Sequence, residues 1–146
     1  MGLVMRRWNE KDGHASIILL AALMYVCMCS PLRADTGTWS SNGGNWTDPS
    51  RWLLGLIPNG QDDEAVFGPD YPSSNAAINM TSTIDLGRLF IDVPRNITFN
   101  GSQPLQFNAT AEARLDVGSG SSGRTHTVNT DIALLSDLLV DLSADS

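Results

Sequence analysis

Residues 83–100 read T-I-D-L-G-R-L-F-I-D-V-P-R-N-I-T-F-N, and apolar side chains recur at every second position on both sides of Gly87. This period of two is typical of a β-strand that buries one face. Gly87 interrupts the alternation, so we expect a bend or bulge there, and Pro94 ends the run. The stretch therefore predicts short strands of a half-buried sheet.

The same alternation of apolar and polar residues in short runs is found elsewhere in the chain, and no segment has a helical period of useful length. The intervals from Ile84 to Leu105 and from Leu105 to Val128 are similar, which indicates successive coils of a β-solenoid. We therefore predict an all-β fold built as a β-solenoid, with a β-sandwich as the alternative. The glycine and serine run at residues 118–123 fits a flexible linker. The other expected strands cover residues 65–67, 105–109, 113–117, 127–134 and 138–142.

Three of the chain's four tryptophans, Trp39, Trp46 and Trp52, lie among Gly, Pro, Asn and Asp turn residues. Buried indoles supply a large apolar area and need a partner for the N–H group, so three of them could pin loops that have no regular ladder. We therefore predict a Trp-rich capping segment over residues 35–75 and a solenoid region over residues 76–146. The alternative is that these three indoles form a flat carbohydrate-binding platform for sugar rings.

Residues 1–34 have the order of a secretory signal peptide, with basic residues first, an apolar run over residues 15–29, and the small residue Ala34 at the end. We predict cleavage between Ala34 and Asp35. The apolar run is shorter than the roughly 20 residues of a spanning helix, so no stable membrane span is expected after cleavage. A retained anchor is the weaker alternative, and a lipoprotein is disfavoured because a methionine precedes Cys29.

The chain beyond this segment contains no cysteine and no lysine, with five arginines against fourteen acidic residues. Disulfides, thiol nucleophiles and cysteine metal sites are therefore excluded there, which favours a bacterial envelope or extracellular protein. Nucleic acid is not an expected partner, because phosphate binding depends on lysine and arginine. We expect a secreted, extracellular or cell-surface location.

The acidic triplet Asp62, Asp63 and Glu64 is the sharpest charged feature of the sequence. Carboxylate oxygens are ligands that calcium prefers. The triplet lacks the Asp-x-Asp-x-Asp-Gly spacing of a calcium loop, so we interpret it as a solvated turn before a strand, with a weak calcium site as the alternative.

Candidate catalytic groups are few. Polysaccharide cleavage would need paired carboxylates, or a base with a metal or an arginine, and the outward aspartates of the expected strands could line a groove. They are also the ordinary solvent face of a sheet. His126 is the only histidine beyond the signal and is interpreted as a surface or strand-start residue, and residues 118–123 contain no G-x-S-x-G elbow. We therefore predict no enzyme activity, no catalytic site and no cofactor. The outward strand aspartates considered as groove residues are Asp85, Asp92, Asp116, Asp131 and Asp141.

Five Asn-x-Ser/Thr sequences would be glycan acceptors in a eukaryotic secretory chain. Outward asparagines on adjacent coils could instead stack as amide ladders, which would favour the solenoid. The sites are Asn45, Asn79, Asn96, Asn100 and Asn108.

Four segments resemble the N-terminal part of bacterial proteins with autotransporter-associated β-strand repeats. They read G-G-N-W-T-D-P-S-R-W at residues 43–52, L-I-P-N-G-Q-D-D-E-A-V-F at residues 56–67, I-D-L-G-R-L-F-I-D at residues 84–92, and H-T-V-N-T-D-I-A-L-L-S-D-L-L-V-D at residues 126–141. The resemblance implies a secreted or surface passenger with a right-handed parallel β-helix of the pectin-lyase-like kind. In such a protein the Trp-rich segment would cap the first coil.

Family members usually continue through hundreds of residues of further coils, whereas this sequence ends at Ser146, just after an expected strand. We therefore expect a truncated product or a short paralogue, with self-association through an open solenoid end. The predicted function is a structural or adhesive surface module that contacts extracellular polysaccharide or cell-surface components. The alternative is a carbohydrate-binding or polysaccharide-processing domain.

Overall fold

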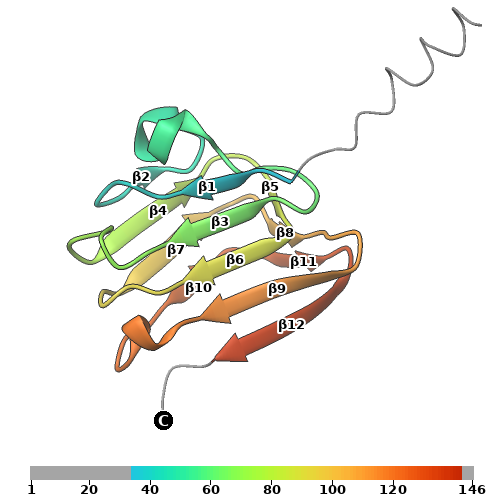
Figure 1. The fold of residues 1–146 in the computed structure, drawn as a ribbon. Coiled ribbons are helices and arrows are strands. Elements are labelled where there is room, and N and C mark those ends of the chain that lie inside the picture. The colour runs from blue at the N-terminus through green and yellow to red at the C-terminus, as the bar shows by residue number, and fades with distance from the viewer. Residues whose placement is uncertain (1–33, 143–146) are drawn as a thin grey trace, which may run out of the picture. The chain divides into compact units, whose positions relative to one another are not determined.

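The computed structural model describes residues 34–142, and these form a β-solenoid of about four coils (Figure 1). All strand ladders between coils are parallel. The predicted solenoid is confirmed, and the parallel pairing excludes the β-sandwich, whose sheets would be antiparallel. The predicted signal peptide lies outside the described residues except for Ala34, so its cleavage stays a prediction.

The coils have three sides, each formed by one sheet. Short 3₁₀ turns interrupt them: η1 (Pro49–Arg51), η2 (Leu53–Gly55) and η3 (Ser119–Ser121). The five-stranded sheet contains β1 (Thr36–Thr38), β3 (Glu64–Phe67), β6 (Arg88–Ile91), β9 (Glu112–Val117) and β12 (Asp137–Leu142). The four-stranded sheet contains β2 (Gly44–Asn45), β4 (Ala76–Met80), β7 (Ile97–Gly101) and β10 (Thr127–Asn129). The three-stranded sheet contains β5 (Ile84–Leu86), β8 (Leu105–Phe107) and β11 (Ile132–Leu134).

Coil length varies along the solenoid. Ile84 pairs with Leu105, which confirms the first predicted interval as one coil. The second interval is wrong, because Leu105 pairs with Ile132 and Val128 pairs with Phe99. The third coil is longer because the turn that contains η3 separates β9 from β10.

The flexible linker predicted at residues 118–123 is also wrong, because this turn packs tightly on the preceding coil. The buried hydroxyl of Ser121 accepts a hydrogen bond from the Val93 N–H at 3.1 Å. The Gly120 N–H donates to the Asp92 carboxylate at 2.6 Å. A Cβ at Gly118 or Gly120 would lie 2.6 Å from an Asp92 oxygen, so the glycines permit a close approach rather than mobility.

Gly87 lies at the corner between β5 and β6, where the sequence predicted a bend. A Cβ at this position would lie only 2.5 Å from the Cα of Asp62 on the preceding turn. The chain therefore needs a residue without a side chain here, because two coils touch backbone to backbone.

Strands β1, β2 and β4 were not predicted. β4 alternates between buried and exposed positions like its neighbours, but its two alanines carry a weak strand signal. β1, β2 and β3 lie within the segment predicted as a cap, and they pair with the same sheets as the later coils.

The inward and outward faces of the four-stranded sheet show how the coils hold together. Inward residues stack in rows, such as Ile78 beneath Phe99, and bury their apolar area against the adjacent coil. Outward asparagines form a second row, and the Asn129 amide donates to the Asn100 side-chain oxygen at 3.1 Å. The amide stacking predicted for asparagines on adjacent coils is therefore confirmed at this step of the row. Its register aligns Asn45, Asn79, Asn100 and Asn129.

Candidate functional site

The three cap tryptophans lie in the core near the first coil, each at most 3% exposed. The Trp46 indole N–H donates to the Pro58 carbonyl at 3.0 Å, and the Trp52 indole N–H donates to the Trp46 carbonyl at 2.6 Å. The Trp39 indole N–H donates to the Ser41 carbonyl at 2.6 Å. Each of these three indoles therefore has both a packed ring and a satisfied donor, which is the condition for stable burial.

Ring contacts connect the three tryptophans to aromatic residues of the later coils. The Trp46 and Trp52 ring centroids are 4.9 Å apart in an edge-on contact, and Trp39 contacts Trp52 at 5.0 Å. Phe67 and Phe99 extend the cluster with a further edge-on contact at 5.4 Å. The structure brings the three proposed sugar-stacking residues together, but it covers their faces with other side chains.

The three carboxylates of the acidic triplet each bond to different protein groups. Asp62 adopts a left-handed conformation with φ of 66°, and its carboxylate accepts hydrogen bonds from the Thr110 hydroxyl and from the Thr110 N–H. Asp63 accepts from the N–H groups of Asp35 at 2.8 Å and Asn59 at 3.0 Å. The Thr110 hydrogen bonds lower the pKa of Asp62 below its usual value.

Glu64 begins an ion-pair row across the outer face of the five-stranded sheet. Its carboxylate lies 2.7 Å from the Arg88 guanidinium, and Arg88 lies 2.6 Å from the nearly buried Asp116. Arg114 approaches the other Asp116 oxygen at 3.2 Å. Burial alone would lower the pKa of Arg88, but its hydrogen bond to Asp116 and the two acidic charges hold it above its usual value. The row joins three coils. Within residues 34–142, no group of three or more His, Cys, Asp or Glu side chains is placed to hold a metal ion.

The other strand aspartates do not converge either. Asp92 fixes the η3 turn through Gly120, and Asp85 accepts from the Asn108 amide at 3.1 Å. Asp131 and Asp141 are exposed. None of these aspartates lines the two cavities described next.

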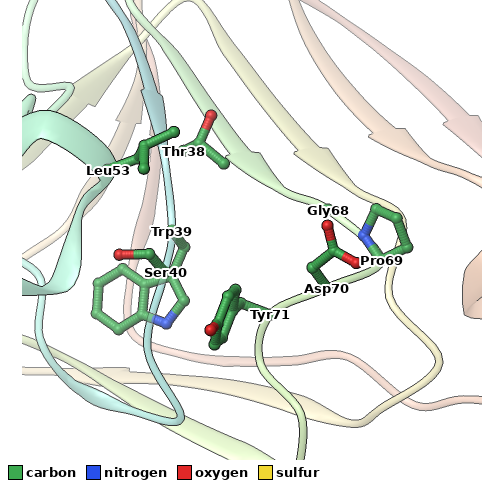
Figure 2. Close-up of a pocket in the computed structure, with 8 residues that line it drawn as sticks. All are labelled: Thr38, Trp39, Ser40, Leu53, Gly68, Pro69, Asp70 and Tyr71. Atoms are coloured by element: carbon green, nitrogen blue, oxygen red, sulfur yellow. The ribbon is translucent and has the colours of Figure 1, made fainter.

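One cavity of about 290 Å³ opens beside the cap, and Figure 2 shows the eight residues that line it. They come from the end of β1, from η2 and from the loop after β3. The buried Trp39 lines it together with Tyr71, which is 45% exposed, and with Asp70. An accessible aromatic ring beside a carboxylate and two hydroxyl residues, Thr38 and Ser40, can bind a small polar ligand with an apolar face. Sequence reasoning missed Tyr71 because it lies in a Pro- and Ser-rich loop.

A second cavity, of about 380 Å³, opens where the last described coil ends. Its apolar lining includes Phe99, Leu115, Val128 and Leu142, which are inward positions of the coils. His126 precedes β10, as expected, but its ring lines this cavity, and both ring nitrogens are buried without a hydrogen-bond partner. Burial lowers the pKa of His126 below its usual value.

No helix among the described residues is long and apolar enough to span a membrane. No protein-family model, curated protein or solved structure matches this chain significantly.

Proposed function

We propose that this chain is a structural or adhesive β-helix module of a protein exported to the cell surface or the medium, without a catalytic role. The observation that carries the proposal is the use of its polar side chains. Asp62 bonds to Thr110 two coils away, and Arg88 joins Glu64 to Asp116 across three coils. Such bonds rigidify a stack of coils, whereas a catalytic site needs groups that converge on a cavity.

The resemblance to proteins with autotransporter-associated β-strand repeats supports export as a passenger-type module. The stacked parallel coils are compatible with that family's expected fold. The signal pattern at residues 1–34 supports the same location.

Export is tested by expressing the full chain in a bacterium and measuring the mass and N-terminal sequence of the protein outside the cytoplasm. The proposal expects a species that begins at Asp35. The matched control is Leu20→Arg, which places a charge in the apolar run and should retain the full-length chain inside. A wild-type chain that stays uncleaved in the cytoplasm would contradict the proposal.

A second candidate function, carbohydrate binding, is favoured by the Tyr71 cavity rather than by the tryptophans. A sugar ring that stacks on Tyr71, which is 45% exposed, would place its hydroxyls within reach of Asp70 in the same cavity. Calorimetric titration with soluble polysaccharides should then give a signal that Tyr71→Ala abolishes and Leu56→Ala retains. Leu56 is a matched control because it is also 45% exposed and does not line the cavity. Equal binding by both variants would exclude this site.

A further inference from the structure

The inward positions of the last described coil are exposed or half-buried, and most of the positions that they cover one coil earlier are buried. Ile132 pairs with Leu105 and Leu134 pairs with Phe107. Leu105 and Phe107 are each 1% exposed, whereas Ile132 is 50% and Leu134 57% exposed. On β12, Val140 is 48% and Leu142 is 66% exposed, above the half-buried Leu115 and Val117. We call this surface the open end. It consists of Val128, Ile132, Leu134, Leu138, Val140 and Leu142.

The open end also presents a free strand edge. β12 pairs along its six residues with β9 and is the last strand of its sheet (Figure 1). Among residues 34–142, no strand pairs with its other edge, which therefore offers backbone N–H and C=O groups next to an apolar face. Such an edge is a template for another strand.

The opposite end of the solenoid is covered. Trp39 pairs with Trp52 in a bridge, the Ser40 N–H donates to the Arg51 carbonyl at 2.8 Å, and Pro58 packs over Gly37. Leucines of η2 are exposed there, but they lie on a 3₁₀ turn that cannot extend a sheet. Among the described residues, only one end of the solenoid is therefore built to add a strand.

We propose that the open end binds the open end of a second copy of this chain, with the two β12 strands antiparallel about a two-fold axis. One adhesive end per molecule closes at a dimer, whereas two such ends would make a filament. The cavity beside His126 would be covered in this dimer, because it opens at the same end.

The sequence of β12 favours a register of this pairing that is centred on Val140. With the axis at Val140, Val140 faces the partner's Val140 and Leu138 faces the partner's Leu142, so inward residues meet inward residues. On the outer face, Leu139 then lies opposite the partner's Asp141. A shift of the axis to Leu139 would set Asp137 opposite the partner's Asp141, and like charges directly opposite destabilise a pair. An axis between two residues would pair inward with outward faces. In the Val140-centred register the strand is therefore self-complementary in its apolar pattern, and no aspartate of β12 lies opposite an aspartate.

Sedimentation equilibrium of the full chain tests the proposal with two matched variants. Val140→Asp places a charge at the axis, and we expect the dimer dissociation constant to rise at least about 30-fold, the effect of a central interface residue. Leu54→Asp, on the covered end, should leave it unchanged, since Leu54 is 87% exposed and outside the open end. Because the chain is acidic, raising the salt concentration should strengthen the wild-type dimer. Circular dichroism checks the fold, and Leu142→Asp serves as a second disrupting variant.

Cysteine cross-linking tests the register. In a Cys27→Ser, Cys29→Ser background, Val140→Cys should oxidise to a covalent dimer and Leu54→Cys should not. A monomeric wild-type chain, or equal association of the Val140→Asp and Leu54→Asp variants, would overturn the proposal. So would cross-linking of Leu54→Cys instead of Val140→Cys, or a ladder of higher oligomers.

Discussion

Replacing Trp46 with alanine tests whether the indole cluster is a structural cap. Trp46 is completely buried, and its ring packs on Trp52 at 4.9 Å and on Phe67 at 6.1 Å. Truncation of a buried tryptophan destabilises a protein by about 3–5 kcal/mol. The Pro58 carbonyl also loses the indole donor, and an unsatisfied buried acceptor costs about 1–3 kcal/mol where water cannot reach it. We therefore expect Trp46→Ala to lose at least about 3 kcal/mol of a total of about 5–15 kcal/mol.

The assay is urea unfolding of the full chain followed by far-UV circular dichroism, because tryptophan emission would itself change. Trp46→Phe keeps an aromatic ring and removes only the N–H donor and part of the volume, so it should lose less than Trp46→Ala. Leu54→Ala is the surface control and should stay within about 0.5 kcal/mol of wild type. A loss below about 1 kcal/mol in Trp46→Ala would refute the structural role and restore the indole as a candidate ligand contact.

Four further predictions concern single substitutions, pH and cleavage of the chain. Asp116→Asn should lower the free energy of unfolding in urea by about 1–2 kcal/mol: Asp116 is buried, but its arginine partners are partly exposed, which limits the loss. Asp137 is exposed, so Asp137→Asn should change the stability little. Gly87→Ala should lower the free energy of unfolding by about 1–3 kcal/mol or more, because its Cβ would overlap the Asp62 backbone. Gly68 has open space around it, so Gly68→Ala should be neutral or slightly stabilising. A larger loss of stability in Gly68→Ala than in Gly87→Ala would contradict the observed corner. His126 has a lowered pKa in the folded chain, so the unfolded chain binds more protons and urea midpoints should fall as the pH drops below about 6.5; His126→Gln should flatten this step. Hydrogen bonds from the Ser50 hydroxyl and N–H lower the pKa of Asp48, and those from Thr110 lower the pKa of Asp62, so protonation of these two carboxylates should remove further stability below about pH 4. The Asp35 N–H donates to the Asp63 carboxylate, and cleavage before Asp35 would turn this donor into an ammonium group. Asp63→Asn should therefore lower the thermal midpoint of the processed chain more than that of the uncleaved chain. Equal effects on the two chains would argue against cleavage at this bond.

The sequence predicted the solenoid because its signal is local. Alternation at residues 83–93 and 97–99 follows directly from burial of one sheet face, and Gly87 marks a corner that tolerates no side chain. The asparagine row was predictable for the same reason, since outward positions repeat with the coil. Strand β4 was not predicted because its alanines have a weak propensity, and pairing with β7 stabilises it instead.

The candidate sites were harder to predict because they depend on contacts between coils. Burial of all three indoles requires knowledge of how β1, η1 and η2 fold over the first coil. Asp116 reads as an ordinary outward aspartate, yet Arg88 and Arg114 from two coils cover it. The glycine and serine run at 118–123 has the composition of a linker, but its glycines let the chain pack against Asp92.

The central claim is that neighbouring strands in space are one coil apart in sequence. Nuclear Overhauser contacts between backbone protons of the isotope-labelled chain test it most directly. The account predicts that the Phe99 backbone contacts Ile78 and Val128, and that Leu105 contacts Ile84 and Ile132. Close Hα–Hα contacts between strands that follow each other in the chain, such as β7 and β8, would show antiparallel hairpins and would contradict the solenoid.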